Sequence, residues 1–370
     1  MQFFGDNRLK LGVFAANLDG GLTASTVEDR QRLSWDNSVD IARLADEGGF
    51  ELQIPLARWK SLGGVTHFNG CNYEGLTWAA GLSAVTCKSN IFATIHVPVI
   101  HPIVAAKQMT TIDHIGHGRF GLNLVCGWFP AEFEMFGAPM MGHDARYEYA
   151  AEWLEIVRKF WTIEDEFDYE GKFFKVTKGW QQPKPLRKPH PPVMNAGQSP
   201  TGARFAAKYA DIAFQSVIEG DAFSTTRTRF SELRRIARED FSRELTIWTG
   251  CWVICRPTEK EARDYLHYCL YEHGDLSALD GLPKEVLPPV DKTPPDVLEQ
   301  IRRKALGGWG GYHLVGTPGQ IVDRLTEFSE AGADGVVLSW VNYQDGLRNW
   351  NREVMPLLEQ AGLRKPRVGA

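Results

Sequence analysis

Short apolar runs alternate along this chain with longer segments in which apolar residues recur every three or four positions. The short runs are typical of buried strands, and the longer segments are typical of helices packed against them. The runs predict eight strands, at Leu11–Ala16, Glu51–Pro55, Asn90–His96, Phe120–Val125, Pro191–Ala196, Ile212–Gln215, Thr246–Cys255 and Gly335–Ser339. The periodic segments predict helices over Ser38–Glu47, Glu74–Thr86, Pro102–Ile115 and Asp144–Trp161, and others that begin at Pro200, Pro257 and Pro318.

This alternation of strands and helices favours a parallel sheet that closes into a barrel. The alternative is a doubly wound open sheet with a second domain. That fold is expected to carry a Gly-x-Gly-x-x-Gly turn after the first strand, and Gly20-Gly21 does not match it. We therefore predict an α/β fold, a (β/α)8 TIM barrel with insertions, as a single domain over residues 1–370.

Two segments are predicted to be insertions into this barrel. Residues 162–190 hold a predicted hairpin at Phe167–Phe174 and a connection rich in proline and lysine. Residues 275–315 hold several prolines and then Trp309, with two glycines on either side. A tryptophan flanked by glycines in a long loop is typical of a mobile lid with an apolar tip. A disordered surface loop explains the same pattern equally well.

Composition and charge exclude several classes of partner. The chain has 370 residues, 43% of them hydrophobic, which is enough for a large buried core. Its net charge is −5 and its lysines and arginines are dispersed, so we expect no nucleic-acid partner. No apolar run reaches transmembrane length, and Met1–Asp6 lacks a basic segment followed by an apolar one. We expect a soluble, cytoplasmic protein with no membrane partner.

The first candidate for chemistry is Asn123. The stretch Gly118–Trp128 resembles a short buried strand that breaks at Gly127, with Asn123 near its end. In an α/β barrel, a polar side chain at the C-terminal end of a strand points into the active-site mouth. An amide buried there costs free energy unless something binds it.

Other strand ends are predicted to line the same mouth. The third predicted strand ends near Thr94 and His96, and the second runs into Ile54–Trp59. The turn after Asn123, Trp128–Glu134, carries aromatic residues and two acids that could wall a flat ligand. A loop that only packs on the barrel rim would have the same sequence pattern.

A phosphate site is predicted after the fifth strand. Ser199 occupies an N-cap position and Pro200 the first helical position, so free backbone N–H groups face the mouth. An ordinary capped helix gives the same pattern. Arg146 and Tyr147, near the start of another predicted helix, could clamp the phosphate and donate a hydrogen bond.

The sequence offers no metal site and no serine nucleophile. Its histidines and cysteines lack the spacing of metal ligands, and there is no Gly-x-Ser-x-Gly elbow. This argues against a metal-dependent hydrolase. A phosphate anchor beside an aromatic mouth instead favours a bound organic cofactor that performs the chemistry.

Taken together, these residues resemble those of the bacterial luciferase-like two-component flavin monooxygenases, over nearly the whole chain. The most similar branch holds the pyrimidine monooxygenases and the dimethyl sulfone monooxygenases. The resemblance is carried by Ala106–Gln108, Thr111–Asp113, Gly118–Phe120, Asn123–Trp128, Asp144–Tyr147, Gly171–Phe174, Pro183–Pro185, Ala196–Ser199 and Val315–Pro318, which are specific together in order and spacing.

The resemblance implies an enzyme that uses reduced FMN (FMNH2), supplied by a separate NAD(P)H:flavin reductase, together with O2. One oxygen atom would enter a small organic substrate (an N-heterocycle, a sulfone or sulfonate, or an amide) through a flavin peroxide. By resemblance, the FMN-binding positions are Ala57, Arg58, Asn123, Glu132, Arg146, Tyr147 and Ser199. The residues implied to hold O2 are Ile54, Thr94 and Asn123. We expect Trp128 and His96 on the substrate side, Trp309 in the lid, and a homo-oligomer (a dimer or a tetramer).

Three positions depart from the pattern of the pyrimidine enzymes. Arg58 replaces a lysine, Cys126 replaces a hydroxyl residue, and His101 replaces a proline. These differences argue against uracil as the substrate and leave the handling of flavin and oxygen unchanged. A deazaflavin-dependent dehydrogenase of the same fold and a non-catalytic flavin-binding protein remain as alternatives.

Overall fold

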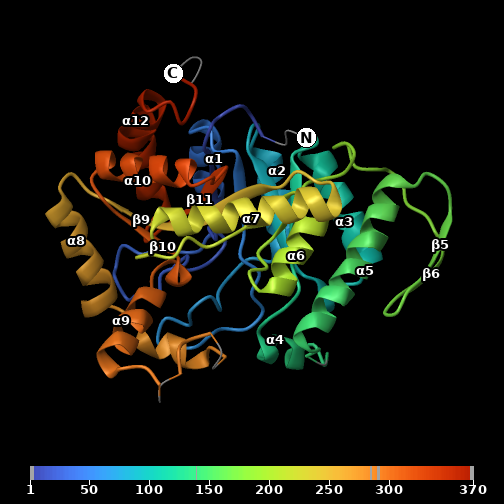
Figure 1. Cartoon of the computed structure of the whole chain (residues 1–370), viewed down its shortest axis with the longest axis horizontal. Helices are drawn as coiled ribbons and strands as arrows, with labels where there is room; N and C mark the ends of the chain where they lie inside the picture. Colours follow the sequence, from blue (N-terminus) through green and yellow to red (C-terminus); the bar gives the residue numbers. More distant parts are fainter. Residues whose placement is uncertain (1–3, 139, 284–285, 290–291, 367–370) are drawn as a thin grey trace.

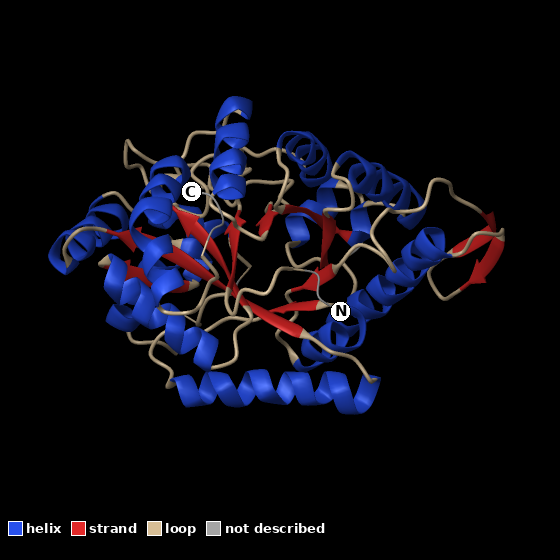
Figure 2. Cartoon of the chain, turned by 90° about the horizontal axis from the view of Figure 1, so that it is seen from above, coloured by secondary structure: helices blue, strands red, loops and turns tan. Residues whose placement is uncertain are grey.

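The computed structural model describes residues 4–138, 140–283, 286–289 and 292–366. Part of the predicted 275–315 insertion, residues 284–285 and 290–291, therefore lies outside the described ranges. The centre of the molecule is a barrel of strands with helices around it, and a two-stranded hairpin projects from the body (Figures 1 and 2).

Eight parallel strands close the barrel in the order β1, β2, β3, β4, β7, β8, β9, β11, and β11 pairs with β1. A further strand, β10, pairs in parallel with the C-terminal half of the long β9. The predicted (β/α)8 fold class is thereby confirmed. The barrel strands are β1 (Lys10–Phe14), β2 (Leu52–Ile54), β3 (Asn90–His96), β4 (Phe120–Val125), β7 (Val193–Asn195), β8 (Ile212–Phe214), β9 (Thr246–Cys255) and β11 (Gly335–Trp340), with β10 at Tyr312–Gly316.

The helices lie outside the strands. The α-helices are α1 (Trp35–Glu47), α2 (Gly75–Val85), α3 (Pro102–Ile115), α4 (Pro130–Met135), α5 (His143–Thr162), α6 (Pro200–Tyr209), α7 (Phe223–Phe241), α8 (Glu259–His267), α9 (Pro295–Ala305), α10 (Pro318–Glu330), α11 (Tyr343–Asn349) and α12 (Met355–Gln360). Short 3-10 segments lie at Val97–Val99, Leu276–Gly281 and Gly308–Gly310, and π-helical segments at Tyr268–Glu272 and Trp350–Val354.

The sequence explains these elements locally. Every residue of β3 and all but the last of β4 are buried, because both faces of a barrel strand are covered, and this is why the runs are apolar without alternation. Ser199 and Thr317 cap α6 and α10 with their side chains, and Pro200 and Pro318 occupy the first helical position as predicted.

Several predicted bounds need correction. Helix α1 begins at Trp35 rather than Ser38 because Ser34 provides the cap. The hairpin strands are β5 (Phe167–Glu170) and β6 (Lys175–Gly179), so the hairpin extends beyond Phe174. Helices α4, α7, α9, α11 and α12 and strand β10 were not predicted. Strand β10 is a short run that begins inside the segment assigned to the second insertion.

Candidate active site

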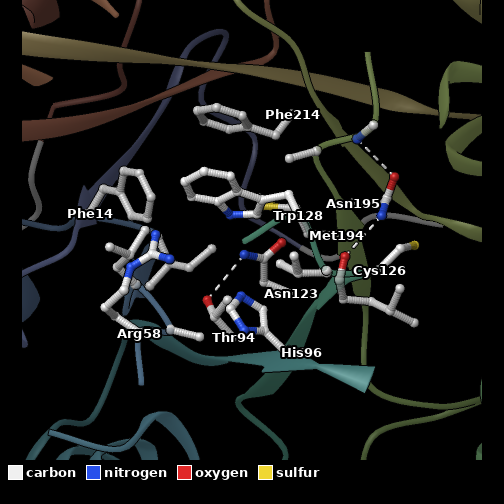
Figure 3. A pocket seen from close by; sticks show the side chains of 18 of the residues that line it. Phe14, Arg58, Thr94, His96, Asn123, Cys126, Trp128, Met194, Asn195 and Phe214 are labelled. Atoms are coloured by element: carbon white, nitrogen blue, oxygen red, sulfur yellow. Dashed lines mark hydrogen bonds between the residues drawn. The ribbon is translucent and has the colours of Figure 1, made fainter. Parts of the chain in front are cut away.

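A cavity of about 330 Å³ lies at the C-terminal ends of the barrel strands. Strand ends supply most of its wall, as expected for this fold. Its aromatic walls are Phe14, Phe214 and Trp128, and Figure 3 shows Asn123 between Trp128 and Thr94. The side chains that line it include Phe14 from β1, Ile54 from β2, Thr94 and His96 from β3, Asn123 from β4, Asn195 from β7, Phe214 from β8 and Val337 from β11.

The carboxamide of Asn123 carries an unused hydrogen-bond acceptor. Asn123 pairs in register with Thr94, and its Nδ2 donates to Thr94 Oγ1 at 3.0 Å. The Thr94 hydroxyl donates in turn to the Pro55 carbonyl, so it can only accept from Asn123. Asn123 Oδ1 is buried and has no partner in the described chain. Leaving such an atom unsatisfied costs about 1–3 kcal/mol, which a donor from a bound ligand would recover.

Asn195, at the end of β7, holds the turn that leads from β7 into α6. Its Nδ2 donates to the Leu124 carbonyl and its Oδ1 accepts from the Gly197 N–H, both at 2.9 Å. A Cβ at Gly197 would lie 2.7 Å from the Gly202 backbone, so only glycine allows the turn to meet the start of α6 this closely. Asn195 was not among the predicted site residues. Its position at a strand end, just before a glycine turn, is the same signal that singled out Asn123.

A buried group of three ionisable side chains lies beside the cavity. Arg58 Nη1 is 3.3 Å from Glu132 Oε1, and His96 Nδ1 is 3.2 Å from Glu132 Oε2. Burial raises the pKa of Glu132, but His96, Arg58 and the Trp59 N–H outweigh this and hold it below its usual range. Burial lowers the pKa of Arg58, and Glu132 opposes that shift. The Arg58 guanidinium also lies 4.9 Å from the Trp128 ring centroid, a cation–π contact.

The predicted phosphate residues gather at the rim. Ser199 Oγ accepts from the Gly202 N–H at 3.1 Å and lies 3.1 Å from His143 Nε2. Arg146 Nη1 donates to the Gly127 carbonyl at 2.7 Å. Tyr147 lines the cavity itself. The start of α6 and the start of α5 therefore meet where an anion would be bound most favourably.

Trp309 packs over the mouth rather than projecting from it. Its ring stacks on Phe68 and meets Trp128 edge-on, with centroids 5.7 Å apart in both cases, and its Nε1 donates to Asn69 Oδ1 at 2.9 Å. Its φ of 59° is in the left-handed region, which costs a non-glycine residue free energy. Trp309 also lines a smaller recess of about 130 Å³ that shares Phe14 and Phe214 with the main cavity.

Neither a cluster of metal ligands nor a membrane-spanning helix occurs among the described residues. No group of three or more histidine, cysteine, aspartate or glutamate side chains there is placed to hold a metal ion. Within the same ranges, no helix combines the length and the apolar character that a membrane span requires.

A family model for luciferase-like monooxygenases matches residues 9–335. The chain belongs to this family. The predicted resemblance is thereby confirmed, and the monooxygenase class is supported at the level of the family.

Relatives within this family cover nearly the full chain. An FMNH(2)-dependent dimethylsulfone monooxygenase of Pseudomonas putida is 28% identical over 368 residues, covering 95% of this chain and 96% of the relative. A pyrimidine monooxygenase, RutA, of Bradyrhizobium sp. is 29% identical, covering 96% and 99%. The crystal structure of a long-chain alkane monooxygenase (LadA) superposes with a TM-score of 0.84 at 21% identity, covering 98% of this chain and 93% of that one, and it supports the fold.

In this luciferase-like chain, some of the residues predicted for the site line the cavity, and the others lie behind its wall or at its rim. Those on the cavity wall are Ile54, Ala57, Arg58, Thr94, His96, Asn123, Trp128 and Tyr147. Glu132, Arg146, Ser199 and Trp309 lie behind the wall or at the rim. His143, which contacts Ser199, was missed because a histidine at a helix start carries no distinctive sequence signal.

Proposed function

We propose that this chain is the oxygenase component of a two-component system that uses FMNH2 and O2 to insert one oxygen atom into a small organic substrate. The observation that carries the proposal is the unpaired Asn123 Oδ1 on the wall of an aromatic cavity, in a chain of this family. The relatives named above, one of them FMNH2-dependent by name, support the cofactor. They do not favour the deazaflavin-dependent alternative.

The residues fit FMN on three grounds. Asn123 Oδ1 needs a donor, and the reduced isoalloxazine ring offers N–H groups. Phe14, Phe214 and Trp128 provide flat apolar walls for such a ring. Ser199, at the start of α6, and Arg146 provide charge and a helix terminus suited to a phosphate.

When bound, reduced FMN supplies the electrons that activate O2. The chain holds and shelters the reacting atoms. Ile54 makes one wall apolar, while Asn123 Nδ2 keeps a second N–H beside the one that it donates to Thr94, and this donor suits a small apolar reactant that gains negative charge. Trp128 and Trp309 exclude water, which would otherwise divert the reaction to hydrogen peroxide.

The remaining expectations belong to the same proposal. A flavin reductase supplies FMNH2, the protein works in the cytoplasm as a homo-oligomer, and the whole chain forms one domain. The relatives match over nearly their whole length, which supports a similar organisation.

The test is turnover with a flavin reductase, NADH and 18O2 over a panel of sulfones, sulfonates, N-heterocycles and amides. We expect incorporation of one labelled oxygen atom into at least one compound. Binding titrations with FMN and deazaflavin accompany the assay. Tighter binding of deazaflavin, or no oxygen transfer across the panel, would contradict the proposal.

A further inference from the structure

The two oxygens of the Glu132 carboxylate are used unequally. Oε1 receives three contacts, from Arg58 Nη1 at 3.3 Å, the Trp59 N–H at 2.7 Å and the Lys60 N–H at 3.4 Å. Oε2 is buried and has no hydrogen bond in the described chain. One oxygen is therefore saturated, and the other is available.

His96 is the group that faces the available oxygen. Its Nδ1 lies 3.2 Å from Glu132 Oε2, and it too is buried and without a hydrogen bond. The side chains are 3% and 1% exposed, so water does not compete for either atom. Two buried atoms at this distance are satisfied together by a small rotation that points an Nδ1–H at Oε2. Because Glu132 is held ionised, it can only accept, and the proton belongs on Nδ1.

This tautomer leaves the lone pair of Nε2 free. The structure gives Nε2 no protein partner within the described residues, and the imidazole lines the main cavity near Thr94 and Asn123 (Figure 3). His96 also lines a second cavity of about 420 Å³. His96, Thr94 and Arg58 thus form a wall between the two spaces.

The other ionisable groups near His96 are already engaged. Arg58, from the loop after β2, is paired with Glu132. Glu74, across the second cavity, caps α2 by accepting from the Leu76 and Thr77 N–H groups, both at 2.8 Å. Cys126 faces the main cavity, but burial raises its pKa to about 12, so it stays a neutral thiol.

We propose that His96 is the acid–base residue of the main cavity and that Glu132 is the residue that positions it. Nε2 takes a proton from an N–H or O–H group of the bound ligand, which is left as the anion. The imidazolium is then stabilised by the Glu132 carboxylate at Nδ1, and it returns the proton from Nε2 to the bound ligand or its product. This rests on the proposed function for the identity of the ligand, whereas the orientation of the imidazole is a property of the protein alone.

The first test reads the tautomer directly, by NMR of the protein with 15N-labelled histidine. We expect the Nδ1–H form for His96, assigned by its loss in His96→Gln. His114 is the internal reference, because its Nε2 lies 2.9 Å from the Lys184 carbonyl and should carry the proton. Glu132→Gln should disturb the His96 signal and leave that of His114 unchanged. An Nε2–H form for His96, or no response to Glu132→Gln, would overturn the proposal.

The second test separates proton transfer from a structural role. In His96→Asn the shorter amide can still donate to Glu132 but offers nothing at the Nε2 position, and in His96→Gln the amide reaches that position but cannot take a proton. We expect both variants to lower kcat for oxygen insertion by about 10²–10⁴-fold, with the Kd for FMN changed by less than about threefold. Full activity of His96→Asn would show that the contact with Glu132 is merely structural. If no substrate is turned over at all, the proposed function fails, and the tautomer alone decides this proposal.

Discussion

The two ends of the barrel differ in whether their buried polar groups have hydrogen-bond partners. At the N-terminal ends of the strands, the Asp46 carboxylate accepts from the N–H groups of Cys87, Lys88 and Ser89 at 2.9, 2.8 and 2.6 Å. Next to it, Arg119 donates four hydrogen bonds of 2.7–3.1 Å. We call this end the base. These two charged groups have their partners, as expected for groups that stabilise the fold.

At the C-terminal ends of the strands, which we call the mouth, buried groups are left incomplete. Arg58 Nε, His96 Nδ1, Asn123 Oδ1 and Glu132 Oε2 all lack a hydrogen bond in the described chain. His96 Nδ1 and Glu132 Oε2 can satisfy each other by a small rotation. Asn123 Oδ1 and Arg58 Nε each cost about 1–3 kcal/mol, so the mouth is less stable than it need be without a ligand.

An unpaired atom alone does not identify a site. Trp248 Nε1 and Thr249 Oγ1, inside β9, also lack partners, yet neither residue lines the main cavity. The mouth differs because its incomplete groups are gathered on or just behind the wall of one cavity. The comparison therefore predicts that mouth substitutions affect chemistry and base substitutions affect stability.

The largest effect is expected for Asn123→Ala. Removing the carboxamide should lower kcat for oxygen insertion by about 10³-fold, in line with the loss of one donor or acceptor from a preorganised site. FMN affinity should fall by only about 1 kcal/mol, the net contribution of one hydrogen bond. The urea midpoint of unfolding should change little, because loss of the bond to Thr94 is offset by removal of the unpaired oxygen. Oxygen-incorporation assays, FMN titration and urea unfolding check the three expectations.

Asn90→Ala is the matched control on the neighbouring strand. Asn90 lies at the base end of β3, where its Nδ2 donates to the Glu51 carbonyl at 3.0 Å and its Oδ1 accepts from Arg187. We expect lower stability and full activity. Equal losses of FMN binding and activity in Asn123→Ala would mean that Asn123 is only an anchor for the cofactor.

The next effect is at the base, in Arg119→Met. The methionine fills part of the same space but leaves the carbonyls of Ser83, Thr86 and Ser89 without their donor. We expect the free energy of unfolding to fall by about 3 kcal/mol, measured by urea denaturation. The kcat of the folded fraction should remain that of the parent chain. A loss of kcat without a loss of stability would break the division between the two ends.

Arg146→Ala tests the rim of the mouth. Arg146 is a candidate for the FMN phosphate, so the variant should bind FMN more weakly by about 2 kcal/mol. Riboflavin lacks the phosphate, and its affinity should hardly change. The two ligands are titrated side by side. A parallel loss for both would assign Arg146 to the ring or to the Gly127 turn, whose carbonyl it contacts.

The fold and the cavity wall were largely predictable because the signals are local. Unbroken apolar runs marked the eight barrel strands, and Ser199 with Pro200 marked the start of α6. Since parallel strands end at one edge, Thr94 and Asn123 were expected together, and their register pairs them directly.

The rest depends on contacts that a single sequence does not encode locally. The free acceptor of Asn123 exists only because the Thr94 hydroxyl is committed to the Pro55 carbonyl. Similarly, Glu132 was predicted as an FMN contact by resemblance. Its side chain, which is 1% exposed, instead lies behind the wall against Arg58 and His96, and whether it influences FMN directly stays a prediction.

The smallest expected effect concerns the pH dependence of the base. Burial raises the pKa of Asp46, but the N–H groups of Ser89, Cys87 and Lys88 lower it more, so it lies below the usual 3.8. A lowered pKa means that the carboxylate stabilises the fold above pH 3.8, and that this contribution is lost as the pH falls through the folded-state pKa. Asp46→Asn should therefore lower the free energy of unfolding by about 1 kcal/mol at pH 7. Below pH 3.8 the difference between the variant and the parent chain should shrink, as measured by urea midpoints across pH. If the difference in free energy of unfolding instead grew in acid, Asp46 would not be a carboxylate whose hydrogen bonds stabilise the base. It could then no longer serve as the fully bonded counterpart of Glu132 at the mouth.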